Sequence, residues 1–352
     1  MRGIRRRFGL VQILVFTLTA GTGIPVLAQG LEGRLTDHQK AETIQVLKDG
    51  IVGEDFSIEH LVESLTEANA VTLMMGPAGV GKATLARNAV ALLGLSGTEF
   101  DLEKNNPGLN RLLTEIGTSV AQGQTDTFII DHIENLPAAE QNLLASVLEK
   151  RVLNLTFNTG AKGGAKKVAV DLSKVRFILI TDQGENIFMN PIGFRTQSTR
   201  YPDTDDFLKN LSDQRMRTSL AGWSLTEPLV SSAKQLIPVR RLNAEEFRIA
   251  IQKTLEQIAL SYGEQLKKTI TIDRQGELVE LLFKREFKNA VSTYHELNEA
   301  VEALFSAETI EAFQSPALKR KKSIVLTWAG DSPHFSPVAA CDFLAGGGKK
   351  GK

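Results

Sequence analysis

Apolar residues follow two different periods along this chain, and the change of period predicts where helices and strands lie. Helical spacing predicts two helices within residues 36–69, separated by Gly50 and Gly53, with Thr36 or Asp37 as the first cap. Short continuous apolar runs predict buried strands at Val71–Met75, Thr127–Ile130 and Val175–Ile180, with helices between them at Thr84–Leu93 and Ala138–Leu153. Strands that alternate with helices predict an α/β domain whose parallel sheet is flanked by helices.

Helical spacing returns in the second half of the chain, after residues 184–222, which carry no strong period and are expected to be irregular surface. The spacing predicts helices at Asn243–Tyr262, Glu277–Lys284 and Tyr294–Phe313, and short strands at Thr269–Ile272 and Ser323–Trp328. Asn243 and Glu246 form a capping-box pattern at the first of these helices. Because a lone strand leaves its backbone groups unpaired, we expect Thr269–Ile272 to pair with Ser323–Leu326.

The N-terminus has a different character from the rest of the chain. Arg2, Arg5, Arg6 and Arg7 precede an uncharged run from Phe8 to Leu31, which is the layout of a secretory signal with cleavage after Ala28. The same run is long enough for an uncleaved membrane anchor. We therefore expect a periplasmic or secreted protein, with a membrane-anchored protein as the alternative. The expected organisation is a signal peptide at 1–28, a large domain at 29–240, a smaller helical domain at 241–330 and a flexible tail at 331–352.

The composition is that of an ordinary globular protein, with 352 residues, 42% of them hydrophobic and 23% charged. Cys341 is the only cysteine, which excludes an intrachain disulfide and a multi-thiolate metal site. The formal net charge is zero, and loss of the signal would make it −4. A chain without a basic excess gives no reason to expect a nucleic-acid partner.

A glycine-rich turn between a predicted strand and a predicted helix predicts a phosphate-binding loop. Such a loop directs successive backbone N–H groups into one concavity, the helix N-terminus adds its positive end, and a lysine supplies a charge for the outer phosphates. A glycine-rich turn that binds no ligand is the alternative. The loop consists of Gly76, Pro77, Ala78, Gly79, Val80, Gly81 and Lys82.

A magnesium site and a hydrolytic base are expected next to this loop, with substitutions in both. The residue after the lysine is Ala83 where a hydroxyl would ligate Mg²⁺, so Thr84 is the only hydroxyl available there. Asp131, at the end of the second strand, is the carboxylate that would hold Mg²⁺ through water. The next residue is His132, where a glutamate base is expected, and it is interpreted either as a base or as a structural residue. Glu134 is expected to point elsewhere.

These motifs in this order resemble those of AAA+ ATPases, most closely the Clp-type unfoldase modules and the torsins. The resembling segments are Ile51–Asp55, Gly76–Lys82, Ile130–Asn135 and Phe177–Gln183. The resemblance implies a P-loop domain followed by a helical lid, binding of ATP or ADP, polypeptide clients, and assembly with like or unlike subunits. It also implies that Ile51 and Val52 line the adenine pocket, that Ala83 and Thr84 follow in the nucleotide site, and that Gln183 is a polar sensor. By the same resemblance Asp131, His132 and Gln183 occupy catalytic positions.

Three further motifs of that family differ in this chain. Leu229–Ser232 carries no cation where the family has an arginine finger, and Arg240 and Arg241 follow about eight positions later. Tyr294–Glu296 lacks the second sensor arginine, and Asn105–Asn110 lacks the aromatic residue of the client-binding loop.

Two functions therefore remain open. One is an ATP-binding chaperone module with weak or absent hydrolysis. The other is a pseudo-ATPase that serves as an exported interaction scaffold.

Overall fold

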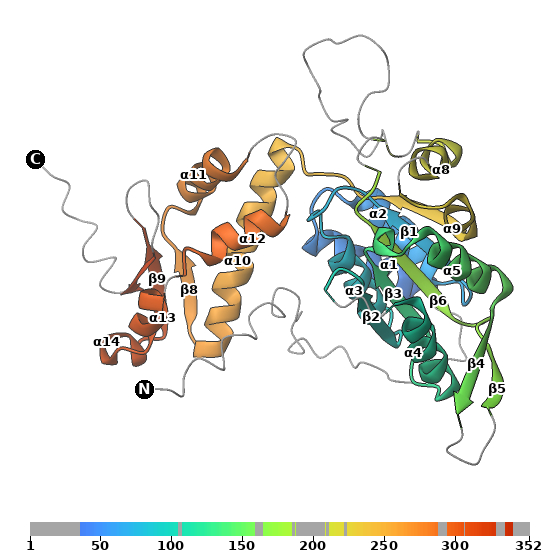
Figure 1. Cartoon of the computed structure of the whole chain (residues 1–352). Helices are drawn as coiled ribbons and strands as arrows, with labels where there is room; N and C mark the ends of the chain where they lie inside the picture. Colours follow the sequence, from blue (N-terminus) through green and yellow to red (C-terminus); the bar gives the residue numbers. More distant parts are fainter. Residues whose placement is uncertain are drawn as a thin grey trace, which may run out of the picture. The chain divides into compact units, whose positions relative to one another are not determined.

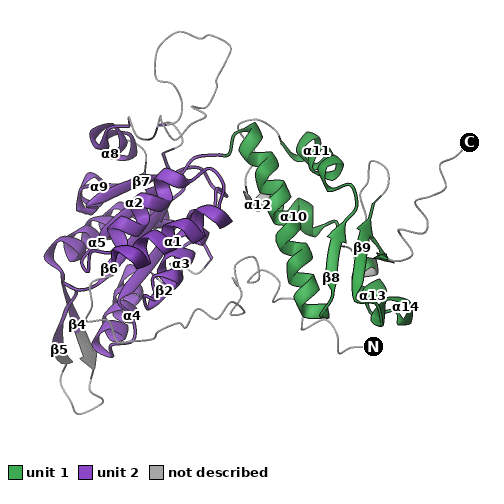
Figure 2. Ribbon diagram, turned by 180° about the vertical axis from the view of Figure 1, so that it is seen from behind, with its two compact units in different colours: residues 1–24, 242–352 green, residues 25–241 purple. Residues whose placement is uncertain are grey.

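The structure, a computed structural model, describes most of the chain after the first 35 residues. The expected signal segment, residues 105–107 of the expected client-binding loop and most of the expected tail lie outside the described residues. The chain forms two compact units, which meet in sequence between Arg241 and Leu242 (Figure 2). The described residues are 36–104, 108–158, 165–184, 187, 208, 211–221, 224–287, 294–305, 307–328 and 335–340.

The larger unit is built on a five-stranded sheet in the order β2-β3-β6-β1-β7 (Figure 1). All neighbouring strands are parallel, with Val71 opposite Phe177 and Thr72 opposite Gln235. This confirms an α/β fold with a parallel sheet flanked by helices. The strands are β1 Val71–Met75, β2 Gly97–Asp101, β3 Thr127–Asp131, β6 Arg176–Thr181 and β7 Gln235–Pro238.

Helices pack against both faces of this sheet, which explains why its inner strands are continuous apolar runs. Along β1, Leu73 and Met75 belong to one buried cluster, with α4, α5, α8 and α9, whereas Met74 belongs to a second cluster, with α1, α2 and α3. The helices are α1 Asp37–Gly50, α2 Asp55–Leu65, α3 Lys82–Leu92, α4 Leu109–Ala121, α5 Ala138–Lys150, α8 Asp213–Ala221 and α9 Glu227–Ser232. Thr36, one of the two residues expected to cap the first helix, is the N-cap of α1.

Several elements of this unit differ from the sequence-based expectation. The helix expected to reach Leu153 ends at Lys150, because Arg151 adopts a left-handed backbone conformation with φ of 55°. The Gly/Lys-rich composition of residues 158–167 predicts a loop or a hairpin, and the chain forms an antiparallel hairpin of β4 Val152–Asn158 and β5 Ala165–Asp171. Residues 213–221, expected to be irregular surface, form α8. Strand β2 was not foreseen because it is a partly exposed edge strand whose residues are mostly polar.

The smaller unit combines helices with a three-stranded sheet in the order β10-β9-β8. Thr269 lies opposite Ser323 and Ile272 opposite Leu326 in a parallel pair, which confirms the expected pairing of these strands. Among the described residues, none of the helices combines the length and the apolar character that crossing a membrane requires. The elements are α10 Ala244–Leu266, β8 Thr269–Ile272, α11 Gln275–Glu286, α12 Tyr294–Glu302, α13 Ala307–Phe313, α14 Pro316–Lys319, β9 Ser323–Thr327 and β10 Ser336–Ala339.

Two expectations for this unit were wrong. The helix expected at Tyr294–Phe313 is divided into α12 and α13, and at the break Phe305 stacks on Tyr262 of α10 with ring centroids 4.9 Å apart. The segment expected to be a flexible tail contains β10, which pairs antiparallel with β9 through Val338 opposite Val325. Strand β10 completes the backbone pairing of β9. Because β10 is so short, the apolar periodicity of its sequence did not indicate a strand.

The capping box at α10 provides a test of this unit. Asn243 Oδ1 accepts hydrogen bonds from the N–H groups of Glu245 and Glu246 at 3.0 and 2.9 Å, and Glu246 Oε2 accepts from the Asn243 N–H at 2.9 Å. Asn243→Ala should therefore lower the free energy of unfolding of the smaller unit by about 1 kcal/mol. Urea denaturation followed by circular dichroism measures this. Gln265→Ala on the same helix is the control, and an equal loss in both variants would contradict the assignment.

Candidate phosphate-binding site

The loop from Gly76 to Gly81 joins the carboxyl end of β1 to the first turn of α3. Gly76 has φ of 147°, and a Cβ atom there would lie 2.0 Å from the carbonyl oxygen of Val239. Gly81, the N-cap of α3, also has a positive φ, 92°. Among the described residues, none accepts a hydrogen bond from the main-chain N–H groups of residues 78–84. Unpaired N–H groups at a helix N-terminus are the donors that bind anions.

Lys82 is held inside this loop by the protein itself. Its ammonium donates to the carbonyl oxygens of Gly76 and Pro77 at 2.9 and 2.6 Å, and to Asp182 Oδ1 at 2.7 Å. The residue is only 4% exposed. A buried ammonium requires such partners, because burying an unpaired charge is costly.

The residues expected to bind magnesium, Thr84 and Asp131, each make hydrogen bonds to other residues of the protein. The hydroxyl of Thr84 accepts a hydrogen bond from Arg87 Nη2 at 3.3 Å, and Ala83 packs against the apolar cluster around α3. Asp131 is buried, and its Oδ1 accepts from the His132 N–H at 2.9 Å. Burial raises the pKa of Asp131 more than the nearby charges of His132 and Lys82 lower it. Binding of Mg²⁺ by Thr84 and Asp131 stays a prediction.

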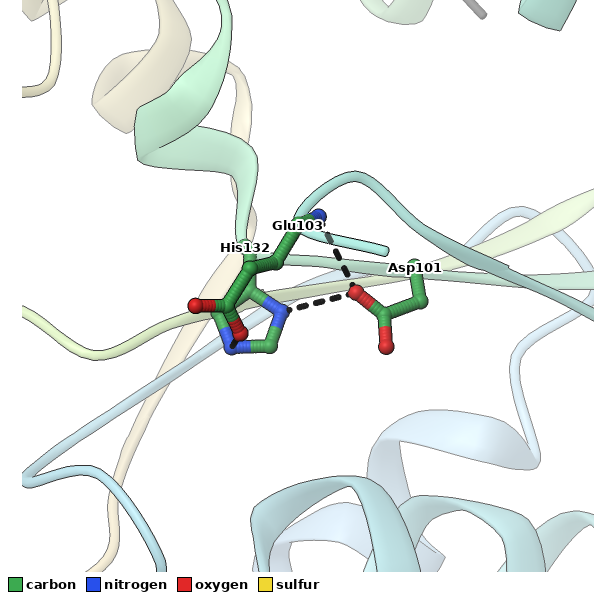
Figure 3. A group of neighbouring side chains, drawn as sticks. All are labelled: Asp101, Glu103 and His132. Carbon is green, nitrogen blue, oxygen red and sulfur yellow. Dashed lines mark hydrogen bonds and ion pairs between the residues drawn. The ribbon is translucent and has the colours of Figure 1, made fainter. Parts of the chain in front are cut away.

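His132 lies at the centre of a group of carboxylates at the ends of β2, β3 and β6. Figure 3 shows the imidazole facing Asp101, the last residue of β2, and Glu103, which follows this strand. Nδ1 is 3.1 Å from Asp101 Oδ1 and 3.7 Å from Asp131 Oδ1, whereas Nε2 is 3.4 Å from Glu103 Oε2 and 3.5 Å from Asp182 Oδ2. The backbone of His132 is left-handed, with φ of 57°.

These carboxylates favour the charged form of the imidazole. Burial lowers the pKa of His132, but the negative charges of Asp131, Asp182 and Asp101 outweigh this effect, so the pKa is raised above its ordinary value. A protonated imidazole has no lone pair with which to accept a proton. The surroundings thus shift His132 toward its protonated form, and its role as a general base stays a prediction.

The same residues offer a set of possible metal donors. One ligand atom from each of Asp101, Glu103 and His132 lies within 4.8 Å of the others. Both ring nitrogens face carboxylate oxygens in the structure, so a metal would have to replace the imidazolium contacts. The geometry is explained without an ion, by a positive ring among negative groups.

Four acidic residues of the site, Asp101, Glu103, Glu134 and Asp182, were not identified as site residues from the sequence. Glu134, expected to point elsewhere, lies in the short turn Ile133–Asn135, and its Oε1 accepts from the Asp182 N–H at 3.0 Å. That expectation was wrong because the left-handed backbone at His132 redirects the chain after β3. Asp182 follows β6 and places one carboxylate oxygen on Lys82. Its position directly after a buried strand and before the expected sensor is the signal that could have indicated it.

Gln183 contacts the loop through its backbone. Its carbonyl oxygen accepts from the Gly76 N–H at 2.9 Å, and its own N–H donates to Thr181 Oγ1 at 3.2 Å. The side chain that reaches Lys82 is that of Asp182. The role of Gln183 as a sensor stays a prediction.

Ile51 and Val52 lie between α1 and α2, on the side of the sheet that α3 covers. Ile51 packs against the apolar cluster that includes Val80 and Val239, and Val52 is buried. This position beside the loop is compatible with lining a base pocket, which stays a prediction.

The segment expected at the arginine-finger position, Leu229–Ser232, is partly buried in the larger unit. Leu229 and Val230 are buried, and the Ser232 hydroxyl donates to the Leu229 carbonyl oxygen at 2.7 Å. Arg240 is 4% exposed, so it does not present a guanidinium to a neighbouring subunit. Arg217, which the sequence did not single out, donates to the Val230 and Ala233 carbonyl oxygens at the end of α9.

A scan against models of known protein families and a search of curated protein sequences found no match for this chain. The fold and the site by themselves define an α/β protein with a five-stranded parallel sheet, compatible with a P-loop-like fold, and a candidate phosphate-binding loop after β1.

The pKa of His132 gives a prediction with a definite sign. Because the folded state raises this pKa, the stabilisation is fully present below the unfolded-state value of about 6.5 and is lost as pH rises through the folded-state value. His132→Asn removes the charge and tolerates the left-handed backbone. The loss in free energy of unfolding should be largest near about pH 6 and should shrink toward about pH 9. Urea denaturation across this range, in buffer with a chelator, measures it.

The acidic groups facing the ring provide the control. In an Asp101→Asn background the same substitution should show a weaker pH dependence, because one facing carboxylate is gone. A loss that is constant with pH, or that grows as pH rises, would contradict the assignment. The charged and titratable groups around the ring are Asp101, Glu103, Lys104, Asp131, Glu134, Asp182 and Lys82.

Proposed function

We propose that this protein binds ATP or ADP through the loop from Gly76 to Lys82, as an AAA+ module of the Clp or torsin kind with weak or absent hydrolysis. One observation carries the proposal: the N–H groups from Ala78 to Thr84 have no acceptor among the described residues and surround a lysine at the start of α3. A chain of free donors that ends at a buried ammonium matches the charge of a polyphosphate.

The topology supports a ligand at this edge. In open parallel sheets, ligands bind beyond the carboxyl ends of the strands, where the chain connections diverge. Strand β6 lies between β1 and β3, so Asp182, which follows β6, is placed between the phosphate-binding loop and Asp131. The smaller unit, with its helices and short sheet, would be the AAA+ lid.

The argument for weak hydrolysis rests on three substitutions. His132 stands in the position of a base and is surrounded by carboxylates that favour its protonated form. Ala83 offers no hydroxyl to a metal, and Ser232 offers no cation to a neighbouring subunit. An arginine finger alone accounts for 10³ to 10⁵ in rate in enzymes that use one, so a site without it is expected to be slow.

Other parts of this proposal rest on the resemblance alone. These parts are the polypeptide clients and the assembly with like or unlike subunits. Export to the periplasm or another secretory lumen, or anchoring in a membrane as the alternative, rests instead on the N-terminal arginine cluster and the uncharged run after it. Since ATP is scarce outside the bacterial inner membrane, export would favour binding over rapid turnover.

The second candidate is a pseudo-ATPase scaffold, and one observation favours it. All of the polar contacts that Lys82 needs are supplied by the protein, so the loop is stable without a nucleotide. A scaffold would retain such a loop for folding rather than for binding.

Calorimetry of the protein without residues 1–28 distinguishes the two candidates. We expect heat of binding with ATP or ADP, with little dependence on Mg²⁺ because Ala83 cannot ligate it. Lys82→Ala should abolish binding, since it removes the charge that would face the phosphates. Lys104→Ala, which removes an exposed cation, is the control and should retain binding. Absence of binding by the unsubstituted protein at millimolar nucleotide would support the scaffold.

Hydrolysis gives an independent prediction. Phosphate release by the unsubstituted protein should be near background. The triple variant Ala83→Thr, His132→Glu and Ser232→Arg should exceed it if the protein assembles, because each replacement supplies a group that typically contributes about 10² or more in rate. Strong activity of the unsubstituted protein that disappears in His132→Ala would show that the histidine is a working base.

A further inference from the structure

We propose that Asp182 sets the nucleotide affinity of the loop by holding the Lys82 ammonium away from the phosphates. This inference rests on the proposed nucleotide binding and names the residue that controls it. Asp182 acts through Lys82, so it is a positioning residue.

The hydrogen bonds of the Lys82 ammonium use all of its protons. A lysine ammonium has three N–H donors. The three acceptors are Gly76 O, Pro77 O and Asp182 Oδ1, all within 2.9 Å of Nζ. No donor of Lys82 is left for a phosphate oxygen, so a nucleotide can gain this contact only by displacing one of the three.

Among the three acceptors, Asp182 is the one that carries a charge. Hydrogen bonds between charged groups are roughly twice as strong as those between neutral groups. The bond is also largely removed from water, since the Lys82 side chain is 4% exposed and that of Asp182 28% exposed. The carboxylate is therefore the acceptor that competes most effectively with a phosphate.

Asp182 is fixed in this position from its other side. Its N–H is held by Glu134 Oε1 at 3.0 Å, and its Oδ2 lies 3.5 Å from His132 Nε2. The carboxylate thus lies between an ammonium and an imidazole. It keeps a cation on each side, so little is gained by turning away from Lys82.

The negative charge also acts directly on a ligand. A polyphosphate at the N–H groups of the loop would approach the carboxylates of Asp182 and Asp131, which already surround Lys82 and His132. The negative charges of the phosphates and of these carboxylates repel each other, and the repulsion is stronger where water is excluded. A neutral side chain at 182 would remove both the competition for Lys82 and part of this repulsion.

The test compares Asp182→Asn with the unsubstituted protein by calorimetry with ADP and with ATP, at fixed salt and pH. Asparagine keeps the shape and a carbonyl acceptor but loses the charge. We expect the dissociation constant to fall about tenfold, the difference between a charged and a neutral buried hydrogen bond. Asp101→Asn is the matched control, because it removes an equal charge from the same cluster at a residue that contacts His132 rather than Lys82. Its effect should be less than about threefold, as for a charge acting only through space.

A second readout needs no nucleotide. Acetic anhydride labelling, followed by mass spectrometry, reports how accessible the Lys82 amine is. Asp182→Asn should raise the labelling of Lys82 severalfold relative to Lys150, an exposed lysine on α5 that serves as the reference. If Asp182→Asn does not fold, as judged by thermal melting, Asp182→Ser supplies the same loss of charge.

The outcomes separate this inference from the proposed function. If the unsubstituted protein binds nucleotide and Asp182→Asn changes neither affinity nor labelling, the role of Asp182 is overturned while nucleotide binding stands. If Asp101→Asn tightens binding as much as Asp182→Asn, the contact with Lys82 is not the cause and the inference fails. If neither the unsubstituted protein nor Asp182→Asn binds nucleotide, the proposed function fails and the inference fails with it.

Discussion

The ion pair between Lys82 and Asp182 is the interaction around which the carboxyl edge of the sheet is organised. Lys82 comes from the first turn of α3, after β1, and Asp182 follows β6, the strand beside β1. Because parallel strands end at one edge, residues 100 positions apart in the chain meet here. Loss of either partner would leave a largely buried charge without its counterion, which is costly.

The other charged side chains at this edge of the sheet are arranged so that negative groups lie next to positive ones. Carboxylates after β2, β3 and β6 outnumber the cations near them, and His132 occupies the space between them with both ring nitrogens directed at oxygens. The left-handed backbone of His132 lets the following turn return Glu134 to the Asp182 N–H. An unliganded loop is thereby stabilised by its own acceptors, at the expense of the contacts that a nucleotide would use.

Much of the larger unit could be predicted from the sequence, because burial on both faces leaves an unmistakable pattern. Strands β1, β3 and β6 are continuous apolar runs, and the loop after β1 is marked by glycines whose positive φ the structure requires. The capping box at α10 could be predicted because Asn243 and Glu246 lie three residues apart in the sequence. These features depend on local sequence alone.

The unpredicted features depend on how side chains turn at strand ends and sheet edges. Neither Glu134 nor Asp182 could be placed, since the direction of a side chain beyond a strand depends on one backbone angle at His132 and on the neighbouring strand. Strands β2 and β10 lie at sheet edges and carry polar or mixed residues, so apolar periodicity does not reveal them.

We propose that a bound nucleotide replaces the Asp182 carboxylate with a phosphate as the partner of Lys82 in the loop after β1. A crystal structure of the protein grown with saturating ADP tests it most directly. We expect phosphate oxygens on the N–H groups between Ala78 and Thr84, with the Lys82 ammonium moved from Asp182 Oδ1 onto a phosphate. Electron density that shows an empty loop at saturating ADP, with Lys82 still bonded to Asp182, would contradict it.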